Sequence, residues 1–201
     1  VSLLAGCSSE PKKEGPPSDK DFILNVSKGL EARWELADNE NTDSYSSAEL
    51  QKAYTKFLKA ETDAVGKESK YKFKDKDLKK VADTYYKGLK LQEEGIQYAG
   101  TDDYTNQEKT WELGYNYRAL AIHEFEKDYG LTVNSKYKSD LDDFLSQYSV
   151  AKKEVAIQEF VDNLQESIQY TKDESQSDEY TTYYSAIIEN TTEYTIDSLS
   201  I

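Results

Sequence analysis

Hydrophobic side chains recur at every third or fourth position through most of residues 21–201, and this spacing is typical of amphipathic α-helices. The first such stripe consists of Phe22, Val26, Leu30 and Trp34. The region contains no proline, the residue that most disrupts helices. The pattern therefore predicts a helical domain over residues 21–201.

Capping signals indicate where further helices begin and end. Ser46 and Glu49 have the spacing of a capping box, in which each side chain bonds the backbone amide of the other residue. A second helix is therefore expected to begin there. A Lys-rich connection, residues 66–76, precedes a third helix that begins near Asp77 and that Gly100 is placed to end.

The same signals continue along the second half of the chain. Thr105 and Glu108 have the spacing of another capping box, which predicts a fourth helix that closes near Gly130. A periodic run over residues 139–172 predicts either one long helix or two helices broken near Ser149.

A last helix is predicted from Glu179 to about Asp197. Its spacing rests on five apolar residues: Tyr180, Tyr183, Tyr184, Ile187 and Ile188. The threonines of this segment favour a helix less, because β-branched side chains lose freedom in one. With short connections between them, these segments predict an all-α protein, an antiparallel bundle of about five to six helices.

Charge restricts the partners that such a domain can have. Lys and Arg together number 25 and Asp and Glu number 39, which gives a formal net charge of −14. Nucleic acid is disfavoured as a partner, because binding it requires cations beside the phosphates. Anionic lipid head groups would also repel the domain, so it is expected to stand off a membrane rather than lie on it.

The N-terminus carries the most specific motif in the chain. Small and apolar residues lead into the sole cysteine, in the run Leu4-Ala5-Gly6-Cys7. This run resembles the lipobox of bacterial lipoproteins, which closes their signal peptide. The resemblance implies that residues 1–6 are the remnant of that signal peptide. It also implies that Cys7 receives a diacylglyceryl group and becomes the first mature residue.

Residues 7–20 are predicted to be the lipidated cysteine and a flexible tether. Residues 8–18 hold all three prolines of the chain and no hydrophobic residue, so they cannot contribute to a core. Two acyl chains on Cys7 would anchor the protein stably. The expected location is the extracellular face of a cell membrane. High usage of Lys, Asn, Tyr and Ile favours an AT-rich genome and a single-membrane, Gram-positive bacterium.

The sequence contains few residues that could perform catalysis. It has no phosphate-binding Gly-rich loop and no Gly-x-Ser-x-Gly turn. His123 is the sole histidine, so sites that need two or three imidazoles are excluded, and we interpret it as a helix-surface residue. These absences disfavour an enzyme, and no cofactor is expected.

One connection between predicted helices has partial resemblance to a calcium loop. Asp38 and Glu49 occupy its first and twelfth positions, with Glu40 and Thr42 at ligand positions between them. Asp43 stands at the sixth position, where the sharp turn needs glycine. An ordinary polar loop is therefore favoured over a calcium site.

Aromatic residues supply the candidate binding site. The set consists of Trp34, Tyr85, Trp111, Tyr115 and Tyr117. These rings either line a groove for glycan or peptide or belong to the core, and helical spacing favours the core. Arg118 lies on or near the apolar face of its helix, where it either pairs with a carboxylate or contacts a ligand.

The leading hypothesis is a non-enzymatic surface lipoprotein whose helical domain binds another macromolecule, an envelope protein or the wall polymer. The first alternative is an accessory envelope enzyme that uses carboxylates, such as Glu112 or Glu124 near Tyr117. A solute-binding lipoprotein is the second alternative, but it requires two α/β lobes, and the chain is short and poor in predicted strands.

Overall fold

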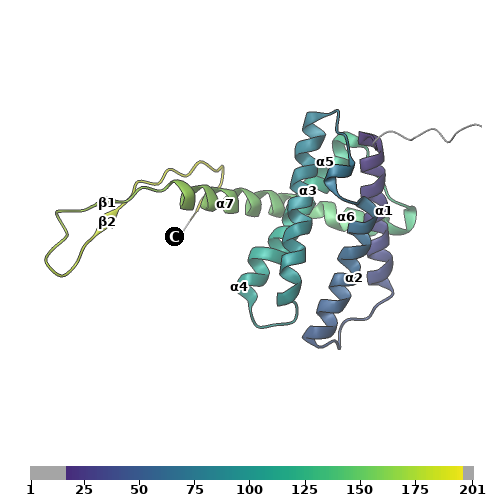
Figure 1. Ribbon diagram of the computed structural model, residues 1–201, viewed down its shortest axis with the longest axis horizontal. Helices are drawn as coiled ribbons and strands as arrows, with labels where there is room; N and C mark the ends of the chain where they lie inside the picture. Colours follow the sequence, from purple (N-terminus) through teal and green to yellow (C-terminus); the bar gives the residue numbers. More distant parts are fainter. Residues whose placement is uncertain (1–16, 197–201) are drawn as a thin grey trace, which may run out of the picture.

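The computed structural model describes residues 17–196 of the chain. Cys7, the lipobox and residues 8–16 of the predicted tether lie outside the described residues. The structure is 68% helical with almost no strand, which confirms the predicted all-α helical bundle. Figure 1 shows α1, α2, α3 and α5 side by side, with α7 packed against α5 at its start and extending away from the bundle.

The first two helices begin at capping boxes. Helix α1 spans Asp19–Asp38 and begins two residues before the predicted boundary at residue 21, because Ser18 and Asp21 cap each other's backbone amides. Helix α2 spans Ser47–Val65, and the predicted capping box of Ser46 and Glu49 is confirmed. A 3-10 turn, η1 (Glu68–Lys70), follows in the Lys-rich connection.

Helix α3 spans Lys76–Gly95 and continues into the 3-10 turn η2 (Ile96–Tyr98). The short helix α4 (Tyr104–Gln107) then leads through a π-helical turn, η3 (Glu108–Glu112), into α5 (Leu113–Tyr129). The predicted capping box at Thr105 is wrong. Asp103 is the N-cap instead, because its carboxylate accepts from the amide of Asn106.

The predicted end of the fourth helix and the break in the long run are both confirmed. Gly130 closes α5 in the left-handed conformation that favours glycine, with φ of 67°. After the 3-10 turn η4 (Ser135–Tyr137), the long run forms two helices, α6 (Lys138–Ser146) and α7 (Tyr148–Ser167). The break lies at Gln147.

The predicted helix from Glu179 to about Asp197 is wrong as far as the structure describes it. The described part of that segment is extended, and a two-residue strand β1 (Thr171–Lys172) pairs antiparallel with β2 (Tyr184–Ser185). No residue from 161 to 196 is buried, so an amphipathic helix would have had no core to cover. The β-branched and aromatic residues of the segment favour extended backbone instead.

The core fills the space between the long helices. Its fully buried aliphatic and aromatic side chains come from five helices (α1, α2, α3, α5 and α7) and from the segment after α5; the largest are Phe22, Leu30, Leu78, Tyr85, Tyr117, Ile122, Phe125 and Leu131. Helices α3 and α5 approach most closely at Gly88 and Gly114. A β-carbon at Gly88 would lie 2.6 Å from the carbonyl oxygen of Gly114, so only glycine allows this crossing.

Candidate functional site

The most unusual feature of the core is a carboxylate at the centre of four helices. Glu61 of α2 is 0% exposed, and its two oxygens accept from Nη2 of Arg118 at 2.6 and 2.7 Å. Nη1 of Arg33 in α1 donates to it at 2.9 Å, and the hydroxyl of Tyr85 in α3 donates at 2.6 Å. Glu61 therefore binds α1, α3 and α5 to α2.

Gln92 of α3 completes this group, which we name the arginine cluster: Arg33, Glu61, Tyr85, Gln92 and Arg118. The side-chain oxygen of Gln92 accepts from Nη1 of Arg118 at 2.9 Å and from Nη1 of Arg33 at 3.1 Å. Two guanidinium groups thus share one carboxylate. Because Arg33 and Arg118 are the only arginines in the sequence, the cluster contains both of them and has an excess of positive charge.

Close helix crossings position these side chains. Gly29, Gly88 and Gly114 are sites where an added β-carbon would lie within 3.0 Å of a neighbouring helix. Arg33, Gln92 and Arg118 each follow one of these glycines by four residues, on the same face of its helix. The short interhelical distances at the glycines therefore bring the three polar side chains together one turn further on.

Electrostatics keep Glu61 ionised inside the core. Burial raises the pKa of this carboxyl, but the guanidinium groups of Arg118 and Arg33 lower it more, so its pKa falls below the usual range. Burial also raises the pKa of the Tyr85 hydroxyl well above its ordinary value, and the negative charge of Glu61 adds to that effect. Tyr85 therefore remains a neutral hydrogen-bond donor to a charged acceptor.

Two donors in the cluster remain without an acceptor in the described part of the chain. They are Nε of Arg118 and Nε2 of Gln92, both fully shielded from solvent by protein atoms. A buried donor without a partner is costly, and such donors are few in native structures.

A cavity of about 270 Å³ opens beside this cluster. Its lining combines both arginines, three aromatic residues and two carboxylates: Arg33, Trp34, Tyr115, Arg118, Asp140, Asp143 and Phe144. Tyr115 and Phe144 pack ring to ring, with centroids 4.4 Å apart. Asp140 and Asp143 come from α6, and neither carboxylate forms an ion pair with another described residue.

The five aromatic residues predicted as one candidate binding site lie in different parts of the structure. Trp34 and Tyr115 line the cavity with Arg118, and Tyr85 lies in the arginine cluster. Trp111 stacks on the ring of Tyr54, with centroids 4.8 Å apart, and Cζ of Arg33 lies 5.7 Å from its ring centroid. Tyr117 is buried elsewhere, with Nζ of Lys87 4.0 Å from its ring centroid. These residues therefore belong to several environments rather than to one groove.

The residues of the possible calcium loop have other contacts. Glu40 pairs with Lys56 at 2.8 Å, and Glu49 accepts from the backbone and hydroxyl of Ser46 in the capping box. Asp38 lies at the end of α1 and Thr42 in the loop that follows. Within residues 17–196, no group of three or more His, Cys, Asp or Glu side chains could hold a metal ion.

The carboxylates considered for an enzyme lie apart from one another. Glu112 lines a hollow beside the π-helical turn, whereas Glu124 lines a different one between α3, α5 and α7. The hydroxyl of Tyr117 donates to Glu159, at 3.2 Å, rather than to either of them. His123 stacks on the ring of Tyr148 at 3.7 Å. The structure brings together no nucleophile and base among these residues.

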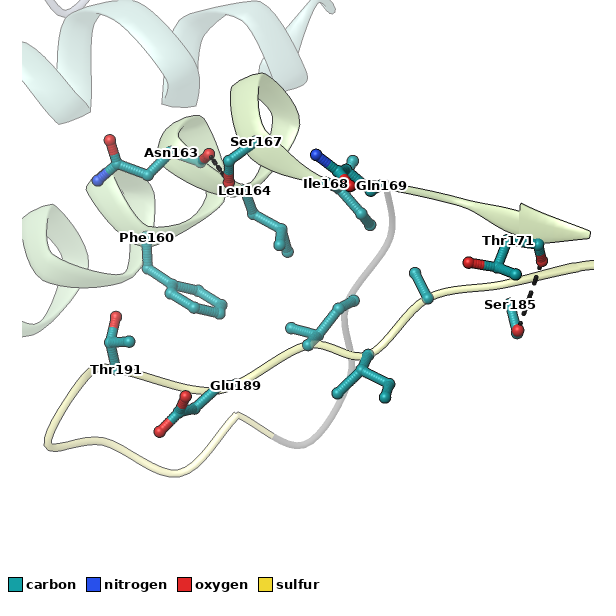
Figure 2. Close-up of a pocket in the computed structure, with 13 residues that line it drawn as sticks. Phe160, Asn163, Leu164, Ser167, Ile168, Gln169, Thr171, Ser185, Glu189 and Thr191 are labelled. Atoms are coloured by element: carbon teal, nitrogen blue, oxygen red, sulfur yellow. Dashed lines mark hydrogen bonds between the residues drawn. The ribbon is translucent and has the colours of Figure 1, made fainter.

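A second surface lies at the far end of α7, in residues 161–196, which we name the acidic arm. Figure 2 shows Phe160 and Leu164 pointing from α7 toward the returning chain at Glu189 and Thr191. The groove between them measures about 700 Å³ and includes Ile168, Ile187 and Ile188. The sequence indicated that Tyr170, Tyr180, Tyr183 and Tyr184 could form an exposed aromatic group, and all four are exposed. It did not indicate the groove, because the segment from Glu179 to about Asp197 was assigned to a helix.

Comparison of the chain with protein-family models, with curated proteins and with solved structures found no match. Within residues 17–196, no helix has both the length and the apolar character needed to cross a membrane.

Proposed function

We propose that this protein is a lipid-anchored surface protein whose helical domain binds another envelope protein, and that the acidic arm forms the binding surface. The observation that carries the proposal is the composition of that arm. It combines exposed apolar side chains with a high density of negative charge, outside the packed bundle.

The charge of the arm indicates the chemistry of the partner. Residues 161–196 contain one lysine against eight Asp and Glu side chains, a formal charge of −7 and half of the net charge of the chain. A surface of this kind attracts cationic polypeptides and speeds their association. It repels anionic wall polymers and lipid head groups, so among the envelope components a basic protein is favoured over the wall.

The apolar side chains of the arm supply the contact area. Ile187 is 100% exposed, and four tyrosines of the arm are also exposed: Tyr170, Tyr180, Tyr183 and Tyr184. Tyrosine is enriched at protein interfaces because its ring is apolar while its hydroxyl can remain hydrated. Large exposed apolar groups beside charged ones commonly mark a protein-binding site.

The lipobox and the tether support the location. A diacylglyceryl group on Cys7 would hold the domain at the extracellular face of the membrane, and residues 8–18 would let it stand away from the lipid surface. The partner is then expected to be another protein at, or secreted across, that membrane.

The test is cross-linking in intact cells that express the wild-type chain or the Cys7→Ser variant. We expect the wild-type protein in the membrane fraction, cross-linked to one dominant basic protein, and the Cys7→Ser variant in the medium or a soluble fraction without that product. Retention of the variant on the membrane would contradict the anchor. Cross-links spread over many proteins, or to none, would contradict the specific partner.

A further inference from the structure

We infer that the cavity beside the arginine cluster binds a small zwitterion, with its carboxylate against Arg33 and Arg118 and its ammonium group between Asp140 and Asp143. This site lies between α1, α5 and α6, away from the acidic arm, and the inference does not depend on the proposed protein partner.

The arginines that line the cavity, Arg33 and Arg118, form its floor and could bind a carboxylate. Two guanidinium groups face a single internal counter-charge, Glu61, so one positive charge is uncompensated within the cluster. Arg118 is only 1% exposed and Arg33 is 13% exposed at its side chain, and both line the cavity. Guanidinium donors have a fixed planar geometry that matches carboxylate oxygens. A ligand carboxylate would supply the missing negative charge.

The two carboxylates that line the cavity, Asp140 and Asp143, form its rim and could bind a cation. Asp140 and Asp143 are three residues apart and therefore share one face of α6. Neither of their carboxylates is held by a described lysine or arginine. The rings of Trp34, Tyr115 and Phe144 also line the cavity, and aromatic faces attract alkylammonium groups through cation–π interactions.

The two charged ends select against simpler ligands. A plain anion would meet the carboxylates of Asp140 and Asp143 as it enters, and a plain cation would meet the guanidinium groups behind them. A molecule with both charges is attracted at each end. The volume of about 270 Å³ is below the range of roughly 300–1,000 Å³ typical of drug-sized ligands, so the ligand is the size of an amino acid or a betaine.

Isothermal titration calorimetry on the full chain tests this site with four probes. Glycine and glycine betaine carry both charges, acetate carries only the carboxylate, and choline carries only the ammonium. We expect at least one zwitterion to bind roughly tenfold or more tightly than acetate and choline. Preference for glycine betaine would assign the cation to the aromatic walls, and preference for glycine would assign it to the aspartates. Absence of binding by both zwitterions, or equal binding of acetate or choline, would overturn the inference.

A matched pair of variants locates the site. The double variant Asp140→Asn/Asp143→Asn removes the charges of the rim, and neither side chain holds the described fold together by a hydrogen bond or ion pair. We expect it to weaken binding of the preferred zwitterion by roughly tenfold or more, with an unchanged circular dichroism spectrum. The control is Asp142→Asn on the same helix, where the carboxylate pairs with Lys138 on the surface at 2.9 Å. Equal affinities of the double variant and the control would overturn the inference.

Discussion

Glu61 and Arg118 form a buried ion pair in which both carboxylate oxygens of Glu61 accept from one nitrogen of Arg118, at 2.6 and 2.7 Å. Their side chains are 0% and 1% exposed, and they lie 57 residues apart in the sequence. The pair joins α2 to α5, and Arg33 and Tyr85 extend it to α1 and α3. The packing of the bundle therefore depends on charge balance as well as on apolar burial.

The first prediction concerns this balance. The variant Glu61→Gln leaves two buried guanidinium groups without a counter-ion, and removing one partner of a buried pair typically costs about 3–5 kcal/mol. We expect a loss of this size in the free energy of unfolding, measured with urea. The control is Glu126→Gln on the exposed face of α5, expected to change stability by less than about 0.5 kcal/mol. Similar losses in the two variants would show that the cluster is not a stabilising element.

The second prediction concerns pH. The pKa of Glu61 is lower in the folded protein than its ordinary value, so the unfolded chain takes up a proton at this site more readily. The stabilisation is therefore complete above the ordinary glutamate pKa, about 4.3, and is lost as the pH falls through the lower folded value. We expect the stability difference between wild type and Glu61→Gln, measured with urea from pH 7 to pH 3, to shrink below about pH 4.3. A constant difference over that range would contradict an ionised Glu61.

The third prediction tests the crossing of α3 and α5. In Gly88→Ala, the added methyl group would lie 2.6 Å from the carbonyl oxygen of Gly114 and 2.7 Å from Cγ of Arg118. The helices would have to separate, which also stretches the arginine cluster. We expect a loss of about 1–3 kcal/mol in the free energy of unfolding. The control is Gly130→Asn, because no other atom lies within 4 Å of a β-carbon at this position and asparagine tolerates the left-handed backbone. We expect this variant to lose less than about 1 kcal/mol in the free energy of unfolding. The reverse order of the two losses would contradict the crossing.

The fourth prediction tests the exposure of the acidic arm. Extended chain without buried side chains opens locally at little cost and is cleaved first by proteases. Brief digestion with chymotrypsin should cut at the arm tyrosines, among them Tyr180 and Tyr184, before it cuts at Tyr45 in the connection between α1 and α2. Mass spectrometry of the fragments identifies the order. Cleavage at Tyr45 first would mean that the arm is better protected than its exposure indicates.

Local signals in the sequence were sufficient for most of the helices. The capping box of Ser46 and Glu49, the closing glycine Gly130 and the three-to-four spacing of apolar residues all act within one or two turns, so a single sequence displays them. Asp103 was missed because two residues only two positions apart, Asp103 and Thr105, could each cap the same helix. Only the geometry of the turn decides between them.

The last segment and the arginine cluster depend on contacts between residues far apart in the sequence, which local patterns do not reveal. Tyr180, Tyr183, Tyr184 and Ile187 have helical spacing, but the spacing predicts a helix only where a core is available to cover. The partners of Arg118 come from helices up to 57 residues away, and no local pattern identifies them. One signal was available, because a chain rich in lysine uses arginine only at positions 33 and 118, and guanidinium groups suit buried pairs better than lysine does.

The most direct test of the proposed function is site-specific photo-cross-linking in intact cells, with the photoreactive residue at position 187 or at position 24. Both native side chains are exposed, Ile187 at 100% and Leu24 at 52%, but only Ile187 belongs to the acidic arm. The proposal predicts one dominant basic protein captured from position 187, absent from position 24 and lost in the Cys7→Ser background. Equal capture from both positions, or no capture from position 187, would contradict the acidic arm as the binding surface.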